Sequence, residues 1–402
     1  MTIRSSNITG TDSEPAPSGH NSPRSPYTVD TITSEKDLFR IREDWDRLSI
    51  SASQPNVFTT FDWYESWFRC FAKGDEMGRL RRNVFVLRRN GVVCGIAPLT
   101  CAEISKFGVR LRRLQFAGRN HEWDYNDLLV GGDLDGKTDA LAEYLSRTMS
   151  DWDLLDLMNI RDTDNAAARI QSAVSCTGLH CILLPTEERC PYMPIDSGWD
   201  KMLSRRSSAT RHSLRNREAK LRRITRDGLR VRILDEPHTE PHLLERMVAL
   251  ESQKRSGGLL SVPFLGDHTE VFESVLSGLG PKGWLRVALL EWGDRLLSWH
   301  LLFRCGNRLW GYMTAYDHEF GRLSPGGMLI PAIIDYGFAH GFTEYDFLSG
   351  EETYKMHWAK GFHQRSRILI WNDRLKSRAY SAYMSQRLTS KLHLRSDAGS
   401  EG

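Results

Sequence analysis

The chain contains an internal repeat, which limits the folds that it can adopt more than any other feature. The segment LDLM, which contains Asp156, aligns with the segment YDFL, which contains Asp346, and Asp127 then falls on Asp317. Both pairs are separated by 190 residues, and the offset continues without a gap over about 45 positions. Such a duplication predicts two similar units arranged in tandem.

Both halves show the same order of secondary structure. In the first half, the hydrophobic pattern predicts two amphipathic helices, a β-hairpin that turns on Asn90 and Gly91, and then a strand, a helix, a strand and a further helix. In the second half, three strands precede a helix over 324–340, a strand, a helix over 351–360 and the strand SRILIW. This order predicts an α/β (α+β) fold of tandem duplicated domains, each with a mixed sheet flanked by helices.

The composition is that of a globular protein. Of the 402 residues, 40% are hydrophobic, and no apolar run approaches the roughly 20 residues that cross a bilayer. Residues 1–27 lack the apolar core of a secretory signal and are predicted to form a disordered leader. The seven cysteines include no C-x-x-C pair, which favours reduced thiols and a cytoplasmic location over a disulfide framework. The composition does not indicate the oligomeric state.

The basic residues are concentrated in one segment. Residues 201–226 contain ten Lys and Arg against Glu218 alone, so this segment carries +9 and the remaining chain −6 within a net charge of +3. The spacing predicts a helix with Arg211 and Arg215 on one side. Three interpretations stay open: a solvated face, a site for an anionic small molecule, and a nucleic-acid or membrane surface. Interleaved aromatic residues are missing, which makes nucleic acid the weakest of the three.

The helix predicted over 324–340 begins with residues that do not favour a helix. Ser324 is suited to cap it and Pro325 to occupy its first position, but Gly326 and Gly327 follow where alanine or glutamate would stabilise the first turn. Glycines at this place leave the backbone N–H groups uncovered, so that a bulky anion can approach them. The sequence therefore predicts an anion site at the start of this helix.

Several segments together resemble a known family. They are FTTFDWYESWF, GIAPLT, RRLQFAG with DYND, YDHEFGRLSPGGMLI and YDFLSGEETYKMHW, of which the last two are the most specific. They resemble the acyltransferases of the GNAT superfamily called CelD-like or BioF-type acetyltransferases, which are related to the Fem aminoacyltransferases of peptidoglycan. The resemblance covers about residues 32–372. It implies two GNAT-like domains, at 28–195 and 196–375, followed by a C-terminal helix and tail at 376–402.

The resemblance implies a use for the glycine-rich turn. GNAT domains bind the pyrophosphate of acyl-CoA on backbone amides at the start of the helix after the fourth strand, which corresponds here to Ser324, Gly326 and Gly327. Arg322, just upstream, would add a charged hydrogen bond. Acetyl-CoA or another acyl-CoA would then be the co-substrate, and the function would be that of an acyltransferase, most simply an N-acetyltransferase.

Acyl transfer requires a base and a group that stabilises the oxyanion. No Ser-His-Asp or Cys-His arrangement is recognisable, so we expect direct transfer to an amine or hydroxyl. Asp346, between two aromatic residues on a strand, is a candidate base, although its repeat partner Asp156 indicates a structural role with equal weight. Lys355 is a candidate electrostatic stabiliser. Tyr354 is a third candidate, whose spacing from Trp358 also fits simple packing.

The other polar residues near this helix have simpler explanations. Ser349 and Glu352 match a capping box, and Gly361 is placed to end the helix. His300 and His357 are candidate bases, but a single histidine in a strand or helix is more often a hydrogen-bonded structural residue.

A polar loop in the first half is the candidate acceptor site. Its polar residues include Arg119, His121, Glu122, Asp124, Tyr125 and Asp127. We predict that Asp124, Tyr125 and Asp127 bind the acceptor, together with Arg211 and Arg215 of the basic segment. Their spacing matches no zinc or calcium pattern, so no metal is predicted. The acceptor, whether a polysaccharide precursor, an amino sugar, a peptide or a lipid-linked intermediate, and the acyl chain length stay open.

Two other functions stay open. The first is a Fem-like aminoacyltransferase that uses charged tRNA, which the basic segment supports, although the long helical hairpin of Fem enzymes is not visible. The second is a non-catalytic interaction protein on the same fold. It is supported by Pro325, which replaces the first glycine of the GNAT pattern, and by Pro331, which should break a hydrogen bond inside the helix.

Overall fold

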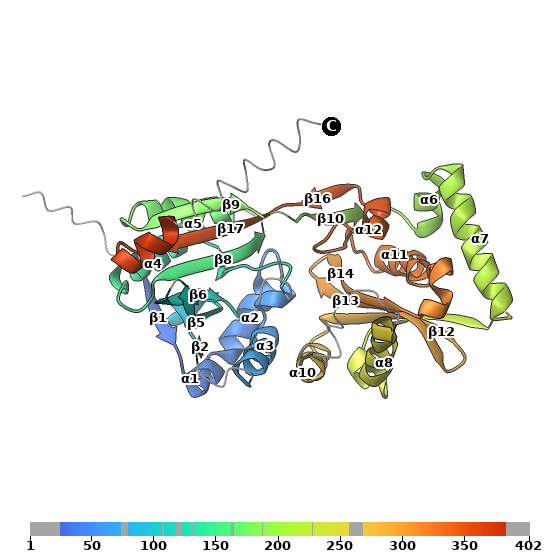
Figure 1. The fold of residues 1–402 in the computed structure, drawn as a ribbon, viewed down its shortest axis with the longest axis horizontal. Helices are drawn as coiled ribbons and strands as arrows, with labels where there is room; N and C mark the ends of the chain where they lie inside the picture. The colour runs from blue at the N-terminus through green and yellow to red at the C-terminus, as the bar shows by residue number, and fades with distance from the viewer. Residues whose placement is uncertain are drawn as a thin grey trace, which may run out of the picture.

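The computed structural model describes residues 25–382 apart from 74–78, 107, 118–122, 131, 162–164, 187, 227 and 257–267. The predicted leader at 1–27 and the tail at 376–402 lie mostly outside these residues. The part of the leader that is described enters the first strand at Tyr27, and the described end of the chain is helical over 375–382. Two α/β halves stand side by side in Figure 1, which agrees with the predicted fold class.

The first half contains two sheets covered by helices. One sheet has the strand order β1-β3-β4-β7 and the other β2-β5-β6-β8-β17-β9. The strands are β1 (Tyr27–Ile32), β2 (Leu80–Arg82), β3 (Val84–Arg89), β4 (Val92–Ala97), β5 (Leu99–Lys106), β6 (Val109–Phe116), β7 (Leu129–Val130), β8 (Leu154–Arg161), β9 (His180–Pro185) and β17 (Arg365–Trp371). The helices are α1 (Glu35–Arg40), α2 (Arg42–Ser51), η1 (Val57–Thr59), α3 (Phe61–Lys73), α4 (Leu134–Arg147) and α5 (Ala166–Ser175).

The second half contains one mixed sheet with the order β11-β12-β13-β14-β15-β10-β16. Its strands are β10 (Cys190–Pro194), β11 (Leu229–Leu234), β12 (Leu285–Trp292), β13 (Arg295–Cys305), β14 (Arg308–Tyr316), β15 (Glu344–Asp346) and β16 (Gly361–His363). Its helices are α6 (Trp199–Ser204), α7 (Ser208–Ile224), η2 (Pro237–Thr239), α8 (Leu243–Ser256), α10 (Thr269–Leu279), η3 (His318–Leu323), η4 (Gly326–Met328), α11 (Leu329–Ala339) and α12 (Thr353–Trp358).

The two halves exchange strands. β10 precedes residue 196 in the chain, yet it lies between β15 and β16 in the sheet of the second half. In return, β17, the strand SRILIW, lies between β8 and β9 in the first half. Figure 1 shows both connections crossing at the same edge of the molecule. The expected ranges 28–195 and 196–375 therefore do not coincide with the two halves in space.

The strand pairing shows where the internal repeat is retained. β8 runs parallel to β6 with Asp156 opposite Gln115, and β15 runs parallel to β14 with Asp346 opposite Trp310. Asp156 and Asp346 thus occupy equivalent places, as the alignment predicts. However, Gln115 and Trp310 are 195 residues apart rather than 190, so the structural repeat is not free of gaps.

The central strands are buried because helices cover both faces of the second sheet. On one face, Leu302 packs with Ile333 of α11. On the other, Trp299 packs with Leu250 of α8, and its indole N–H donates to the Met247 carbonyl at 3.1 Å. This sandwich explains why β13 is a nearly continuous apolar run and not an alternating one.

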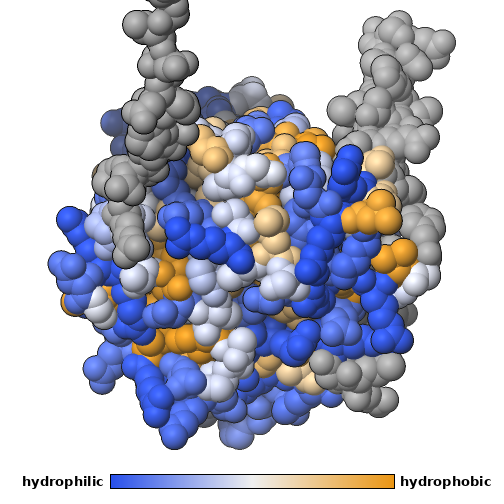
Figure 2. All heavy atoms as spheres, turned by 90° about the vertical axis from the view of Figure 1, so that its left-hand side faces the viewer, coloured by the Kyte–Doolittle hydropathy of each residue, from blue (hydrophilic) through white to orange (hydrophobic). Residues whose placement is uncertain are grey.

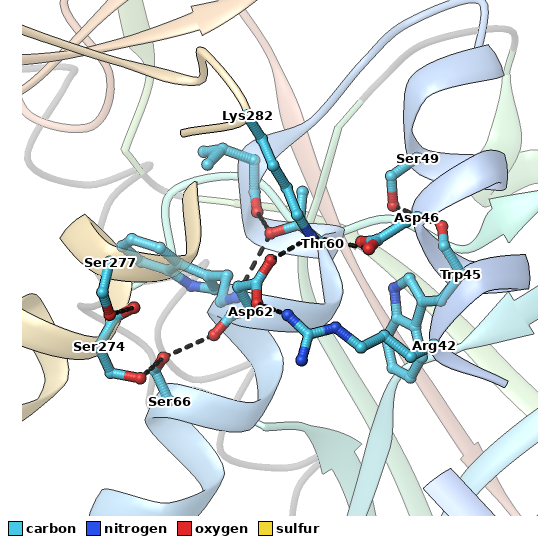
Figure 3. A network of polar contacts seen from close by, with 12 residues as sticks. Arg42, Trp45, Asp46, Ser49, Thr60, Asp62, Ser66, Ser274, Ser277 and Lys282 are labelled. Atoms are coloured by element: carbon cyan, nitrogen blue, oxygen red, sulfur yellow. Dashed lines mark hydrogen bonds and ion pairs between the residues drawn. The ribbon is translucent and has the colours of Figure 1, made fainter. Parts of the chain in front are cut away.

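A network of charges around the buried Asp62 joins the halves (Figure 3). Lys282, which follows α10, bridges Asp46 of α2 at 2.7 Å and Asp62 of α3 at 2.6 Å. Arg42 contacts the other oxygen of Asp62 at 2.8 Å. Beside this network the hydrophobic core is continuous, since Phe58 stacks on Trp310 of β14 with ring centroids 5.8 Å apart. These contacts place the two halves in a defined arrangement.

The outer surface of the first half is mostly hydrophilic. Figure 2 shows this face with hydrophobic residues in small separate patches. In the part of the chain that the structure describes, no helix is both long and apolar enough to cross a membrane. All seven cysteines have free thiols.

Candidate functional site

The predicted anion site lies in the connection between β14 and α11. After η3, Ser324 adopts a left-handed conformation with φ of 52°, and Pro325 begins a 3₁₀ turn that leads into α11 at Leu329. The prediction that Ser324 caps the helix is therefore wrong, because its backbone turns the chain instead. Pro331 is the third residue of α11, where no intrahelical acceptor exists for an N–H. The expected break at this proline does not occur for that reason.

The glycines of this turn present free donors. Within the described residues, no acceptor takes the amide hydrogen of Gly326 or Gly327. A Cβ on Gly327 would meet only the Ser324 Cβ, at 3.6 Å. A Cβ on Gly326 would be 3.6 Å from His300 Nε2. The turn is thus half-buried, open on one side and supported from below by the sheet.

His300 supports this turn from β13. Its side chain is 4% exposed, and burial lowers its pKa to about 4, although a hydrogen bond with the Gly326 backbone raises it. A neutral, buried imidazole is suited to hold the turn in place. The structure therefore places this candidate base under the turn.

The basic segment lies beside the turn, but not through the residues that were predicted. Arg217 of α7 donates to Ser324 Oγ at 3.2 Å. Arg211 instead hydrogen-bonds backbone carbonyls between α6 and α7, and Arg215 is exposed. Arg322, the predicted phosphate ligand on η3, is exposed as well.

Arg206 adds a second guanidinium group in the neighbourhood of Arg217, and His357 lies close to both. Arg206 donates to the carbonyls of His357 and Trp358 at 3.3 and 3.1 Å. The pKa of His357 is lowered by burial and by Arg206 and Arg217, so this ring is close to both guanidinium groups. An anion bound at the Gly326–Gly327 amides would therefore lie beside the guanidinium of Arg217, with that of Arg206 nearby.

The corresponding helix of the first half is closed to anions. Asp133 caps α4 by accepting from the Gly136 amide at 3.0 Å and from the Tyr27 hydroxyl at 2.8 Å. These hydrogen bonds lower the pKa of Asp133, which keeps it ionised. A carboxylate at this end repels a phosphate, so the two halves differ in their capacity to bind one.

The parallel strands β14 and β15 separate just beyond the buried Asp346. They pair only through three residues of each strand, and the last pair is Trp310 with Asp346. Past this pair the side chain of Tyr345 approaches Gly311, where a Cβ would lie 2.3 Å from its hydroxyl. Only glycine at 311 permits this contact, which fills one side of the separation.

Asp346 is held by partners from both halves. Its side chain is 1% exposed, and its carboxylate accepts from the Tyr125 hydroxyl at 2.7 Å and from the Leu348 amide at 2.8 Å. Burial raises its pKa to about 6, opposed by His363 and by these hydrogen bonds. Its repeat partner Asp156 differs, because Arg367 binds both of its oxygens at 2.8 Å. The two aspartates thus share a place in the fold but not an environment.

His363 connects Asp346 to a second carboxylate. Its Nε2 lies 2.9 Å from Glu344 and 3.9 Å from Asp346, and its ring stacks on Tyr192. Ligand atoms of Glu344, Asp346 and His363 lie within 4.8 Å of one another, which is the spacing of a metal site. Each already has a protein partner, since Arg308 contacts Glu344 at 3.3 Å. We assign no metal to this cluster.

Lys355 is buried, and its ammonium group contacts a carbonyl and a carboxylate. Its ammonium donates to the Ser349 carbonyl and lies 3.0 Å from Glu352. The predicted capping box is wrong, because α12 begins at Thr353 and the Ser349 hydroxyl binds Glu188 at 2.6 Å instead. Gly361 does not end α12 but begins β16.

Asp124 from the first half meets this group. Its carboxylate accepts from the Ser349 amide at 3.2 Å. Burial raises the pKa of this carboxylate above its usual value, and the positive charges of Arg365 and Lys355 only partly oppose the shift. Arg365 is 2% exposed and donates to the Asp124 carbonyl at 2.9 Å. Tyr354, on the same helix as Lys355, is 42% exposed, yet the atoms around its hydroxyl raise its pKa.

The remaining residues of the predicted acceptor loop are dispersed. Arg119, His121 and Glu122 lie outside the described residues. Asp127 accepts from its neighbouring Leu128 amide at 2.8 Å and lines a cavity of about 50 Å³. The structure thus brings Asp124 and Tyr125 to the junction of the halves, where they meet Ser349 and Asp346.

Sequence reasoning missed four residues of this region. Arg217 carried a signal, because it lies one turn before the buried Leu221 and so on the inner edge of its helix. Arg365, Arg206 and His363 carried no local signal, since their partners come from distant segments.

Comparisons with known proteins agree with this arrangement. Residues 208–356, which run from α7 into α12 and include the glycine turn, match the model of the acetyltransferase (GNAT) domain. None of the curated proteins matches the chain. The predicted resemblance to GNAT acyltransferases is thus confirmed for the second half.

Solved structures match nearly the whole chain. The crystal structure of FemX superposes with a TM-score of 0.54 at 14% identity, covering 85% of this chain and 96% of that chain. A conserved protein of unknown function from Bacteroides thetaiotaomicron superposes with a TM-score of 0.55 at 9% identity, covering 86% of this chain and 100% of that chain. At these identities the likeness shows the fold, which both halves share with these proteins.

Proposed function

We propose that this protein is an acyltransferase that moves an acyl group, most simply acetyl, from acyl-CoA to an amine or hydroxyl. One observation carries the proposal: the free amides of Gly326 and Gly327 stand at the start of α11, beside Arg217, within the segment that matches the GNAT domain. Free amides, the positive end of a helix and a guanidinium group together favour a diphosphate.

The donor would bind to the second half alone. Its pyrophosphate would lie on the turn at 325–328, with Arg217 and the exposed Arg322 as charged partners. Asp133 disfavours the same binding in the first half. The thioester would extend toward the point where β14 and β15 separate, close to Trp310 and Asp346.

The acceptor would enter from the junction of the halves. There, Asp124 with its raised pKa and the exposed Tyr354 would contact an amine, which must lose a proton when it attacks the thioester carbonyl. Asp346 is the proposed base, because a pKa of about 6 leaves it ionised at neutral pH yet able to hold a proton. His363, 27% exposed, would connect Asp346 to solvent.

Lys355 takes a different role from the one expected. Its ammonium is committed to Ser349 and Glu352, so we propose that it holds the Ser349 backbone against Asp124 and thereby positions the acceptor site. The acceptor itself, whether a polysaccharide precursor, an amino sugar or a peptide, belongs to the proposal only as a class, as does a cytoplasmic location.

A Fem-like reaction with aminoacyl-tRNA is the second candidate. It is favoured by the fold shared with FemX and by the exposed arginines of α7. The two functions differ in the donor, since only the first requires the turn at 325–328 to bind a free diphosphate.

The two candidates are separated by ligand-dependent unfolding. Acetyl-CoA at about 100 times its dissociation constant should stabilise the protein by about 2.7 kcal/mol, and CoA should act similarly. Radiolabelled acetyl transfer to a panel of amines then identifies the acceptor class. If neither acetyl-CoA nor CoA changes the melting temperature while aminoacyl-tRNA does, the acyl-CoA proposal is wrong.

A further inference from the structure

We infer that the outer face of α7 docks the protein on an anionic lipid surface. This inference goes beyond acyl transfer and does not depend on it. The helix lies at the outer end of the second half, at the right-hand edge of Figure 1, and presents its length away from the sheet. Its 17 residues extend over about 25 Å, enough to lie along several lipid headgroups.

The two sides of α7 differ sharply in character. Leu221 is fully buried and Leu214 packs against the core of the second half. On a helix, the residues opposite Leu221 include Arg215, Lys220 and Arg223, and all three are exposed. The helix is therefore held by its apolar side, and the opposite side has no packing role.

The charge of the outer face is not neutralised by the protein. Within the described residues, Arg215, Lys220 and Arg223 form no ion pair. Glu218 is the acid of this helix, and it pairs with Arg222 at 2.9 Å. An unpaired row of cations raises the local potential and attracts a polyanion, at a strength that falls with salt.

A lipid surface fits this row better than a nucleic acid. The face is convex and lies along an edge, and it has no Phe, Tyr or Trp side chain on which a base could stack. Apolar groups stand at the end of the row, where Ile224 is 52% exposed and Val231 of the neighbouring edge strand β11 is 42% exposed. A polybasic helix with a few apolar residues at its end is suited to the headgroup region of an anionic bilayer.

The docking would also orient the turn at 325–328, where acyl-CoA is proposed to bind (the donor turn). Arg217 projects from the inner edge of α7 onto Ser324, so the turn lies directly behind the cationic face. A protein held by this face would keep the turn close to the lipid surface, where a lipid-linked acceptor would be presented.

The test uses the full chain and vesicles, without donor or acceptor. Cosedimentation is measured with phosphatidylcholine vesicles that contain about 30% phosphatidylglycerol, and with pure phosphatidylcholine. We expect binding to the anionic vesicles alone, lost at high salt. The triple variant Arg215→Gln, Lys220→Gln and Arg223→Gln should bind at least about tenfold more weakly. Arg217 is kept so that the donor turn is intact.

A matched variant controls for net charge. Lys36→Gln, Arg40→Gln and Arg110→Gln remove three exposed cations from the first half and should leave vesicle binding unchanged. Equal losses in both variants, or no binding to anionic vesicles at low salt, would overturn the inference. So would an RNA oligonucleotide that binds the same face and displaces the vesicles at lower concentration. Because acyl transfer is not measured, failure here leaves the proposed function untouched.

Discussion

The pKa of Asp346 makes the stability of the protein depend on pH in an unusual direction. Burial raises this pKa from 3.8 to about 6, so between these values the folded protein holds a proton that the unfolded chain has released. Acidification through this range therefore stabilises the fold, and the effect ends below the unfolded pKa, where both states are protonated. Above about pH 6 the ionised carboxylate destabilises the folded state by about 3 kcal/mol relative to a neutral group.

Replacing Asp346 with asparagine removes this titration. We compare the unfolding free energies of the wild type and Asp346→Asn. Between about pH 4 and about pH 7.5, the wild type should lose about 2 kcal/mol of stability relative to the variant. Other carboxyl groups titrate in both proteins and cancel in the difference. Urea unfolding followed by tryptophan fluorescence at several pH values measures this quantity directly.

A second variant tests the cause. The Tyr125 hydroxyl donates to the Asp346 carboxylate and favours its ionised form, so Tyr125→Phe should move the midpoint of the transition to higher pH. In the acyl transfer assay, the wild-type rate should decrease as the pH is lowered through about 6. The rate of Asp346→Asn should be low and should not change with pH over the same range. A difference in stability that does not vary with pH would refute the argument that Asp346 is a buried, titrating base.

Three further outcomes are expected from substitution. Gly327→Val should weaken acetyl-CoA binding at least about tenfold in calorimetry while changing stability by only about 1 kcal/mol, since it covers the amides and meets little else. Arg217→Gln should raise the KM for acyl-CoA and reduce its salt dependence, and Arg215→Gln, two residues away on the outer face, should not. Lys282→Met should lower the unfolding free energy by about 1–3 kcal/mol, because it removes one of the two cations that pair with the buried Asp62, whereas Lys73→Met, in an exposed ion pair, should cost under about 1 kcal/mol.

Local features of the fold were readable from the sequence. Asn90 and Gly91 both adopt positive φ and close the hairpin between β3 and β4, as this dipeptide predicts. Gly326 and Gly327 mark a turn whose amides are free, because glycine at a helix start is hard to explain by helix stability. Each of these signals depends on neighbours within a few residues.

The strand exchange was not readable, because it depends on which edges of two similar sheets meet. SRILIW has the same apolar pattern whether it pairs in the first sheet or the second, and the structure pairs it with β8 and β9. The same limit applies to the site. Tyr125 and Asp346 were each candidates, but their contact joins residues 221 positions apart.

Side-chain competition explains the local errors. Ser349 has the position of a helix cap, yet its hydroxyl binds Glu188 and also accepts from Arg365 at 2.8 Å. In the basic segment, the charge pattern predicted a role for Arg215, but the packing of Leu221 turns Arg217 toward the donor turn. A helix face can be assigned only when the element that covers it is known.

Amide hydrogen exchange with and without acetyl-CoA tests the central claim most directly. The account predicts that acetyl-CoA slows exchange of the amides at 326–329, including Gly326 and Gly327, and leaves residues 133–136 at the start of α4 unchanged. Protection at 133–136, or no protection at 326–329 at saturating acetyl-CoA, would contradict a donor site on the glycine turn of the second half.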